Sequence, residues 1–147
     1  MSIQAATIQA PTIQAPSIHE PTLPAKPTST WIRVCSIADL EVERGRAALI
    51  DGEQVALFLL HGGRVHAVQQ LDPFSGASVM SRGIVGSRGD IPTVASPMYK
   101  QVFDLRTGMC LDTQGKEPHG EYPTSLRVYP VSVDDAGDVL IRWKART

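Results

Sequence analysis

Short apolar runs separated by turn residues dominate the chain from residue 31 onward. In the first run, residues 31–36, apolar side chains alternate with other residues, as in a half-buried β-strand. Further runs lie at 47–50, 54–60, 64–69, 91–95, 101–105, 109–111, 126–133 and 139–143, with an isolated Val85 between them. Such runs recur about every ten residues without helical periods between them, which predicts an all-β fold, an antiparallel sandwich or barrel.

The segments between these runs have the composition of tight turns. Asp51-Gly52-Glu53 lies between two runs and predicts a hairpin, as does Arg106-Thr107-Gly108 further on. We expect helical structure only as a short turn over residues 37–43 and a second short turn after Gly76.

Residues 1–30 follow a different pattern. From Ile3 the sequence reads IQAAT, IQAPT, IQAPS and IHEPT, a five-residue repeat with Ile first and Thr or Ser last. Prolines cannot continue a helix and deny a sheet its donors; they lie at Pro11, Pro16, Pro21, Pro24 and Pro27. We therefore predict a disordered, extended leader over 1–30 and a folded domain over 31–147. The regularly spaced isoleucines either dock on a partner or belong to a tolerated low-complexity segment.

Composition excludes several classes of function. The 147 residues favour one domain, and 42% apolar with 20% charged residues is typical of a soluble globular protein. A net charge of −1 gives no basic surface for nucleic acid or an acidic membrane. No stretch approaches the roughly 18 apolar residues of a membrane span, and no secretory signal precedes the domain. We expect a cytoplasmic protein.

The two cysteines, Cys35 and Cys110, could form one disulfide, but a core of this size needs none, which favours two free thiols. Neither lies at a C-x₂-C spacing, and the histidines show no H-x₃-H spacing, so no metal site is indicated.

Two loops depart from the plain β pattern. The first reads Asp-Pro-Phe-Ser-Gly-Ala over residues 72–77, and the second reads Ser-Pro-Met-Tyr-Lys-Gln-Val-Phe-Asp-Leu-Arg-Thr-Gly over 96–108. They resemble the two cluster-binding loops of Rieske domains, which run Cys-Pro-His-x-Gly-Ala and Cys-Pro-x-His-Gly, the latter followed by Phe-Asp-Leu-x-Thr-Gly. The resemblance implies a Rieske-like antiparallel β fold, with both loops at the former cluster site.

The four ligand positions of that family are all substituted. The cysteine positions carry Asp72 and Ser96, and the histidine positions carry Phe74 and Tyr99. A Rieske centre needs two thiolates on one iron and two imidazoles on the other. A hard carboxylate, a neutral hydroxyl, a phenyl ring and a protonated phenol cannot replace them. We predict that this chain holds no cluster and no other metal.

With these substitutions the chain resembles the small subunit of bacterial assimilatory NAD(P)H nitrite reductase, over about residues 31–143. Residues 83–86 and 95–101 are the most specific segments. The resemblance implies an oxidoreductase subunit in nitrate assimilation, paired with a large subunit that carries FAD, an iron–sulfur cluster and sirohaem and reduces nitrite to ammonia. This chain would carry no cofactor and no catalytic residue. Asp72 and Asp104 could be taken for a catalytic carboxylate pair, but each also suits the first position of a turn.

Recognition of the large subunit is then the expected task. Our hypothesis places the contact at the loop tips, made of Pro73, Phe74, Pro97, Met98, Tyr99 and Lys100. Phe74 and Tyr99 would pack against each other where the cluster was, while Met98 and Lys100 would point outward. Alternatively, the two rings only fill the core and the contact lies elsewhere. Two other functions stay open: a binding module for a different oxidoreductase, and an electron-transfer ferredoxin, which needs ligands that the chain lacks.

Overall fold

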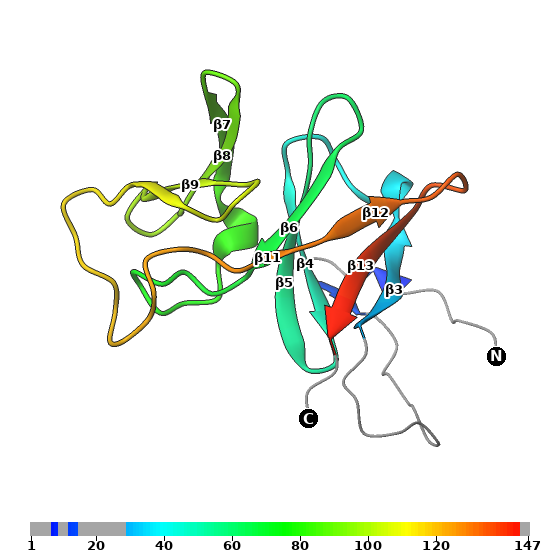
Figure 1. The fold of residues 1–147 in the computed structure, drawn as a ribbon, viewed down its shortest axis with the longest axis horizontal. Helices are drawn as coiled ribbons and strands as arrows, with labels where there is room; N and C mark the ends of the chain where they lie inside the picture. Colours follow the sequence, from blue (N-terminus) through cyan, green and yellow to red (C-terminus); the bar gives the residue numbers. More distant parts are fainter. Residues whose placement is uncertain (1–6, 9–11, 15–28, 145–147) are drawn as a thin grey trace.

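The computed structural model describes residues 7–8, 12–14 and 29–144, and these form an all-β fold (Figure 1). The strands are β1 (Thr7–Ile8), β2 (Thr12–Gln14), β3 (Ser29–Ser36), β4 (Gly45–Ile50), β5 (Glu53–Leu59), β6 (Val65–Gln69), β7 (Ile84–Arg88), β8 (Ile91–Ala95), β9 (Val102–Asp104), β10 (Cys110–Asp112), β11 (Val128–Tyr129), β12 (Val131–Val133) and β13 (Asp138–Lys144). Two 3₁₀ turns, η1 (Ile37–Asp39) and η2 (Met80–Arg82), complete the elements. The predicted fold class is confirmed.

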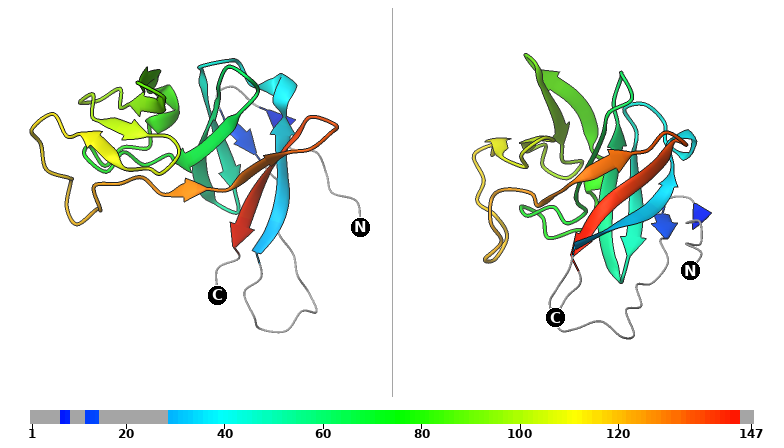
Figure 2. Two further views of the ribbon diagram at one scale, coloured as in Figure 1. Left: turned by 45° about the horizontal axis from the view of Figure 1, so that its top comes forward. Right: turned by 45° about the vertical axis from the view of Figure 1, so that its right-hand side comes forward.

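The strands form three sheets in two lobes, which lie side by side in Figures 1 and 2. The larger lobe holds a sheet of order β1-β2-β4-β5-β6-β11 and a sheet of order β12-β13-β3. The smaller lobe holds the sheet β10-β9-β8-β7 and the loops around it. Apart from the parallel pair of β2 and β4, the neighbouring strands are antiparallel.

Strand β5 explains how one core joins the two lobes. Its run is continuously apolar because both faces are buried, and successive side chains of a strand point to opposite faces. Val55 and Leu57 face the cluster between the two sheets of the larger lobe, together with Ile50 and Ile141. Phe58, on the other face, belongs to a second cluster that reaches into the smaller lobe through Met80, Phe74 and Phe103. The loops of the smaller lobe are therefore anchored on the back of the larger one.

The segment predicted as one strand over 126–133 is two strands. Pro130 has no N–H for a ladder and separates β11, which pairs with β6, from β12, which pairs with β13 in the other sheet. The turn predicted over 37–43 is only the three residues of η1, closed by a capping box between Ser36 and Asp39. The second predicted turn, after Gly76, is present as η2.

The leader differs in part from its prediction. Proline content argued against any strand before residue 30, yet Thr7–Ile8 and Thr12–Gln14 form β1 and β2, and β3 begins at Ser29. Strand β1 precedes Pro11 and β2 lies between Pro11 and Pro16, so neither strand contains a proline, which explains the difference. The rest of the predicted disordered leader lies outside the described residues, so the division at residue 30 stays a prediction. No helix among the described residues is long and apolar enough to cross a membrane.

Candidate functional site

The first loop, Asp72–Ala77, is held by a closed set of hydrogen bonds. The amide of Phe74 donates to the Asp72 side chain (Oδ1, 2.9 Å), and the amide of Gly76 donates to the Asp72 carbonyl (2.8 Å). The Asp72 amide donates across the base of the loop to the carbonyl of Ala77 (2.8 Å). Gly76 takes a left-handed φ of 77°, which a glycine adopts without steric cost.

The second loop, Ser96–Gln101, repeats this frame position by position. The amide of Met98 donates to the Ser96 hydroxyl (3.1 Å), and the amide of Lys100 donates to the Ser96 carbonyl (3.1 Å). The Ser96 amide donates to the carbonyl of Gln101 (2.9 Å). Lys100 stands where the first loop has Gly76 and takes a φ of 65°, so a side chain occupies a backbone conformation that favours glycine.

A third copy of the frame, Asp104–Met109, joins β9 to β10. The Arg106 amide donates to Asp104 Oδ1 (2.8 Å), the Gly108 amide donates to the Asp104 carbonyl (2.7 Å), and the Asp104 amide donates to the Met109 carbonyl (2.8 Å). The prediction that Asp104 opens a turn is therefore confirmed. Burial raises the pKa of Asp104, but hydrogen bonds from Arg106 outweigh it and hold this pKa below its ordinary value.

The two positions that correspond to the cysteine ligands are bonded directly to each other. The Ser96 hydroxyl donates to Asp72 Oδ2 over 2.6 Å, and the Ser75 hydroxyl donates to the same oxygen over 2.8 Å. Asp72 and Ser96 are 0% and 1% exposed. A short hydrogen bond in a water-excluded site is stronger than one in solvent. This bond joins the first loop to the second, and the sequence analysis did not foresee it.

The two positions that correspond to the histidine ligands are far from equivalent. Phe74 is 5% exposed and packs against Phe103, with ring centroids 6.1 Å apart at 55°. Tyr99 is 45% exposed, and the ammonium of Lys116 lies over its ring, 4.9 Å from the centroid. The expected packing of Phe74 against Tyr99 is therefore wrong. Phe103 already supplies an aromatic partner inside the core.

Residues 113–124 form a third loop beside the other two, which their sequence did not indicate. The His119 amide donates to the Pro73 carbonyl (2.7 Å), and the imidazole of His119 lies against Gly76 and 6.2 Å from the Tyr122 ring. With Lys116 on Tyr99, the third loop contacts both others. Its prolines and glycines marked it only as a loop, because nothing in the sequence shows which surface a loop covers.

The predicted tip residues divide between core and surface. Pro97, Met98, Tyr99 and Lys100 are exposed, as expected for a contact surface. The first-loop residues Pro73 and Phe74 are buried, so they support this surface from behind. We call the four exposed residues, together with Lys116, the second-loop tip.

These side chains do not fit an iron–sulfur cluster. Asp72 and Ser96 are hydrogen-bonded to each other and to groups of their own loops, Phe74 is part of the core, and Tyr99 is exposed with Lys116 over its ring. None of them supplies the thiolate or imidazole that sulfide-bridged iron requires. Within the described residues, no group of three or more His, Cys, Asp or Glu side chains could hold a metal ion.

Both cysteines are free thiols. Cys35 is buried in β3, and burial raises its pKa to about 12, so it is a protonated, unreactive core residue at neutral pH. Cys110 is half-buried in β10, and burial raises its pKa as well.

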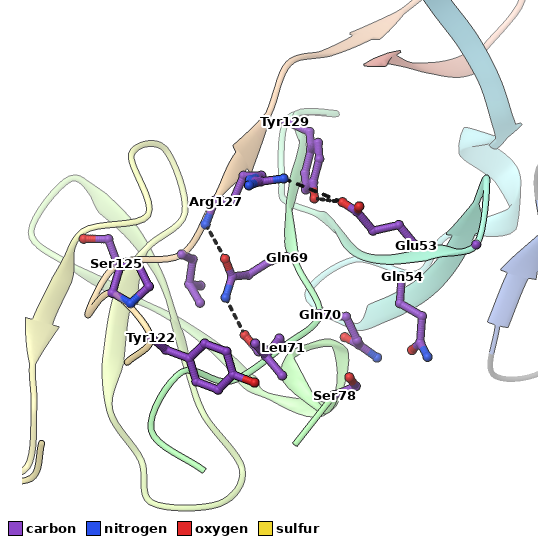
Figure 3. A pocket seen from close by; sticks show the side chains of 13 residues that line it. Glu53, Gln54, Gln69, Gln70, Leu71, Ser78, Tyr122, Ser125, Arg127 and Tyr129 are labelled. Atoms are coloured by element: carbon purple, nitrogen blue, oxygen red, sulfur yellow. Dashed lines mark hydrogen bonds and ion pairs between the residues drawn. The ribbon is translucent and has the colours of Figure 1, made fainter. Parts of the chain in front are cut away.

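A polar groove of about 740 Å³ runs beside the first loop, between the sheet and the chain that leaves the third loop (Figure 3). The Gln69 side chain spans its floor, accepting from the Arg127 amide (2.8 Å) and donating to the Leu71 carbonyl (2.8 Å). The Tyr129 hydroxyl donates to Glu53 (2.6 Å), beside the Arg127 guanidinium at 3.9 Å. These hydrogen bonds and the ion pair hold Arg127 and Tyr129, which follow the third loop, against Gln69 and Glu53 of the larger lobe.

Comparison with known proteins agrees with this geometry. The family of Rieske-like [2Fe-2S] domains matches residues 30–142. A solved structure from Mycobacterium tuberculosis, assigned as an NADH-dependent nitrite reductase small subunit, is 45% identical. It has a TM-score of 0.69 and covers 81% of this chain and 99% of its own.

Two curated relatives add detail. The nitrite reductase (NADH) small subunit of Salmonella typhimurium is 41% identical over 87 residues, which are 58% of this chain and 81% of that protein. The nitrite reductase [NAD(P)H] large subunit of Klebsiella oxytoca is 37% identical over 112 residues, which are 76% of this chain. The match spans only 11% of that large subunit, so the large subunit contains a segment similar to about three quarters of this chain.

Proposed function

Because the chain belongs to the family of Rieske-like [2Fe-2S] domains and, within it, to the nitrite reductase small subunits, we propose that it is a non-catalytic subunit of an NAD(P)H-dependent nitrite reductase. The large subunit would carry FAD, an iron–sulfur cluster and sirohaem, and would reduce nitrite to ammonia in the cytoplasm during nitrate assimilation. This chain would take part by binding that subunit, without a redox step of its own.

The observation that carries the proposal is the hydrogen bond between Asp72 and Ser96. This bond joins the same two loops that a cluster joins in ligated relatives. The loops therefore stay together although their side chains include no thiolate or imidazole at the ligand positions. An electron-transfer ferredoxin needs two cysteine thiolates and two histidine imidazoles as ligands, so these positions do not support that alternative function. The similar segment inside the Klebsiella oxytoca large subunit favours a working position of the domain beside the large subunit.

The contact surface that we propose is the second-loop tip. Met98 and Tyr99 expose apolar area of the kind enriched in interface cores, at 48% and 45% exposure. Lys100 and Lys116 place two positive charges beside them, so the matching surface of the large subunit should be apolar at its centre and acidic at its rim. The frame of the second loop orders the backbone of Ser96–Gln101 before binding, which lowers the entropic cost of association.

The test is NAD(P)H-driven nitrite consumption by the purified large subunit, with and without this chain. We expect activity to depend on the chain, and Met98→Ala and Lys100→Ala to raise the concentration needed for half-maximal activation about ten-fold each. Met109→Ala is the matched control, because Met109 is also exposed, at 58%, but lies in the Asp104–Met109 loop outside the tip. Full activity without the chain would refute the subunit function. Activation that depends on the chain but is unchanged in both tip variants would move the contact elsewhere.

A further inference from the structure

The outer edge of the larger sheet is occupied by the leader. Strand β4 pairs with β5 along its whole length, from Gly45 opposite Phe58 to Ile50 opposite Glu53. On its other side it pairs in parallel with β2, with Thr12, Ile13 and Gln14 opposite Ala47, Ala48 and Leu49. Strand β1 then adds to β2 as an antiparallel neighbour. Without these two strands, β4 would be the edge of the sheet in the described structure.

Strand β4 is a poor edge by itself. Its sequence Gly-Arg-Ala-Ala-Leu-Ile is almost uncharged, contains no proline and no lysine, and pairs regularly with β5. Protein edges are normally protected by charges, prolines, bulges or a covering segment, because unpaired N–H and C=O groups on a flat apolar strand recruit other strands. A covering strand is the protection that this edge has.

The phase of the repeat coincides with the strands. Both β1 and β2 begin at the Thr that ends one repeat and continue into the Ile that begins the next, at Thr7–Ile8 and at Thr12–Gln14. Thr and Ile favour strands, whereas Pro11 stands in the sequence between β1 and β2 and Pro16 follows β2, so neither strand contains a proline. Each junction between repeats therefore carries one short unit that can pair, and every repeat from Ile8 onward also contains one proline.

We propose that the leader is an edge cap in cis, in which a Thr-Ile-Gln unit completes the sheet at β4, and that the repetition supplies interchangeable caps. Units of the same type stand at Ser2-Ile3-Gln4, Thr7-Ile8-Gln9, Thr12-Ile13-Gln14 and Ser17-Ile18-His19. A shift by one repeat again brings Thr or Ser followed by Ile opposite β4, so loss of one unit is compensated by a neighbour. The isoleucine spacing thus serves a partner surface within the same chain. This inference is independent of the proposed enzyme.

The experiment is amide hydrogen exchange of the full chain by NMR, monitored at the β4 amides that do not bond to β5. The first variant is Ile13→Pro, the second has all four isoleucines replaced (Ile3→Pro, Ile8→Pro, Ile13→Pro, Ile18→Pro), and the control is Ala15→Pro, which adds a proline outside both strands. We expect the four-fold variant to exchange at these amides at least about ten-fold faster than the unaltered chain. Ile13→Pro should exchange less than about three-fold faster, and the control should not change.

Three outcomes would overturn the proposal. Unchanged exchange in the four-fold variant means that the leader does not cap β4. An effect of Ile13→Pro as large as that of the four-fold variant means that the units are not interchangeable. Protection that rises with protein concentration, together with a dimer in sedimentation, means that the cap comes from a second copy. The amides of β5 bonded to β6 serve as the internal reference, because a general loss of stability would accelerate them too.

Discussion

The first loop buries its proline and its aromatic ring, whereas the second loop exposes both, although the two share the same backbone hydrogen bonds. The first loop has glycine at its left-handed position and the second has Lys100. The first rests on the core through Phe74, and the second reaches solvent with Met98 and Tyr99. A shared backbone frame therefore separates two tasks: one copy supports, and the other presents side chains.

The largest effect should come from exchanging each aromatic ring for a methyl group. Phe74→Ala removes a buried ring from the cluster with Phe103 and should cost about 3–5 kcal/mol of unfolding free energy. Tyr99→Ala removes an exposed ring and should cost less than about 0.5 kcal/mol. Urea unfolding of both variants measures the difference. Equal losses would show that the second loop is also a support.

The bond between the loops should give the next largest effect. Asp72→Ala leaves the Ser96 and Ser75 hydroxyls and the Phe74 amide without their acceptor and should cost about 3 kcal/mol. Ser96→Ala should cost about 1–2 kcal/mol, and the double variant should cost about 1 kcal/mol less than the sum, because the two groups interact directly. Strictly additive losses in this double-mutant cycle would mean that the loops are held together by other contacts.

A smaller effect should follow from the left-handed positions. Lys100→Gly relieves a side chain at φ 65° and should stabilise the fold by about 0.5 kcal/mol. Gly76→Ala should cost about 1 kcal/mol or more, because φ is 77° and a Cβ would lie 3.0 Å from the His119 ring. Lys100→Ala keeps the strain while it removes the charge, so it separates backbone relief from partner binding. Thermal unfolding of the three variants gives the signs.

The smallest effect at neutral pH should come from Arg106, in the third copy of the frame. Its hydrogen bonds hold the pKa of Asp104 below the ordinary carboxyl value, against burial that raises it. A carboxyl with a lowered folded pKa adds stability above its unfolded pKa, and that stability is lost as pH falls through the folded pKa. Arg106→Gln raises the folded pKa of Asp104, so the variant should be less stable than the unaltered chain at neutral pH and should lose less stability as the pH falls, in unfolding midpoints measured from pH 2 to 7. Superimposable profiles would contradict this assignment.

Much of the fold could be predicted from sequence, because alternation and turn residues report local geometry. The hairpin between β4 and β5 was expected at Asp51–Glu53, and Asp104 was expected to open a turn; both are present. Failures arose where two distant segments decide the outcome. Asp72 was recognised as a turn residue, but its bond to Ser96 depends on loops 24 residues apart being brought together. The break at Pro130 was missed for the same reason, because the residues before it pair with β6 and those after it pair with β13 in another sheet.

The sequence motif predicted where the two loops lie along the chain, but not which residues their side chains contact. The two loops and their four substituted positions were identified from their resemblance to the cluster-binding loops of Rieske domains. The sequence did not show which aromatic ring packs against Phe74. That ring is Phe103, which lies on β9, and the motif gives no information on contacts between the first loop and β9. The contacts of the third loop were missed because its prolines and glycines indicate a loop but not the surface that the loop covers.

The hydrogen bond between Asp72 and Ser96 also bears on the supply of the finished subunit. A ligated domain of this fold closes its loops around imported iron and sulfide, so its maturation depends on delivery of both. Here both groups that close the loops are encoded in the chain and are present as soon as it is synthesised. The abundance of the folded subunit should then follow protein synthesis alone, through iron starvation and through exposure to oxidants that dismantle clusters.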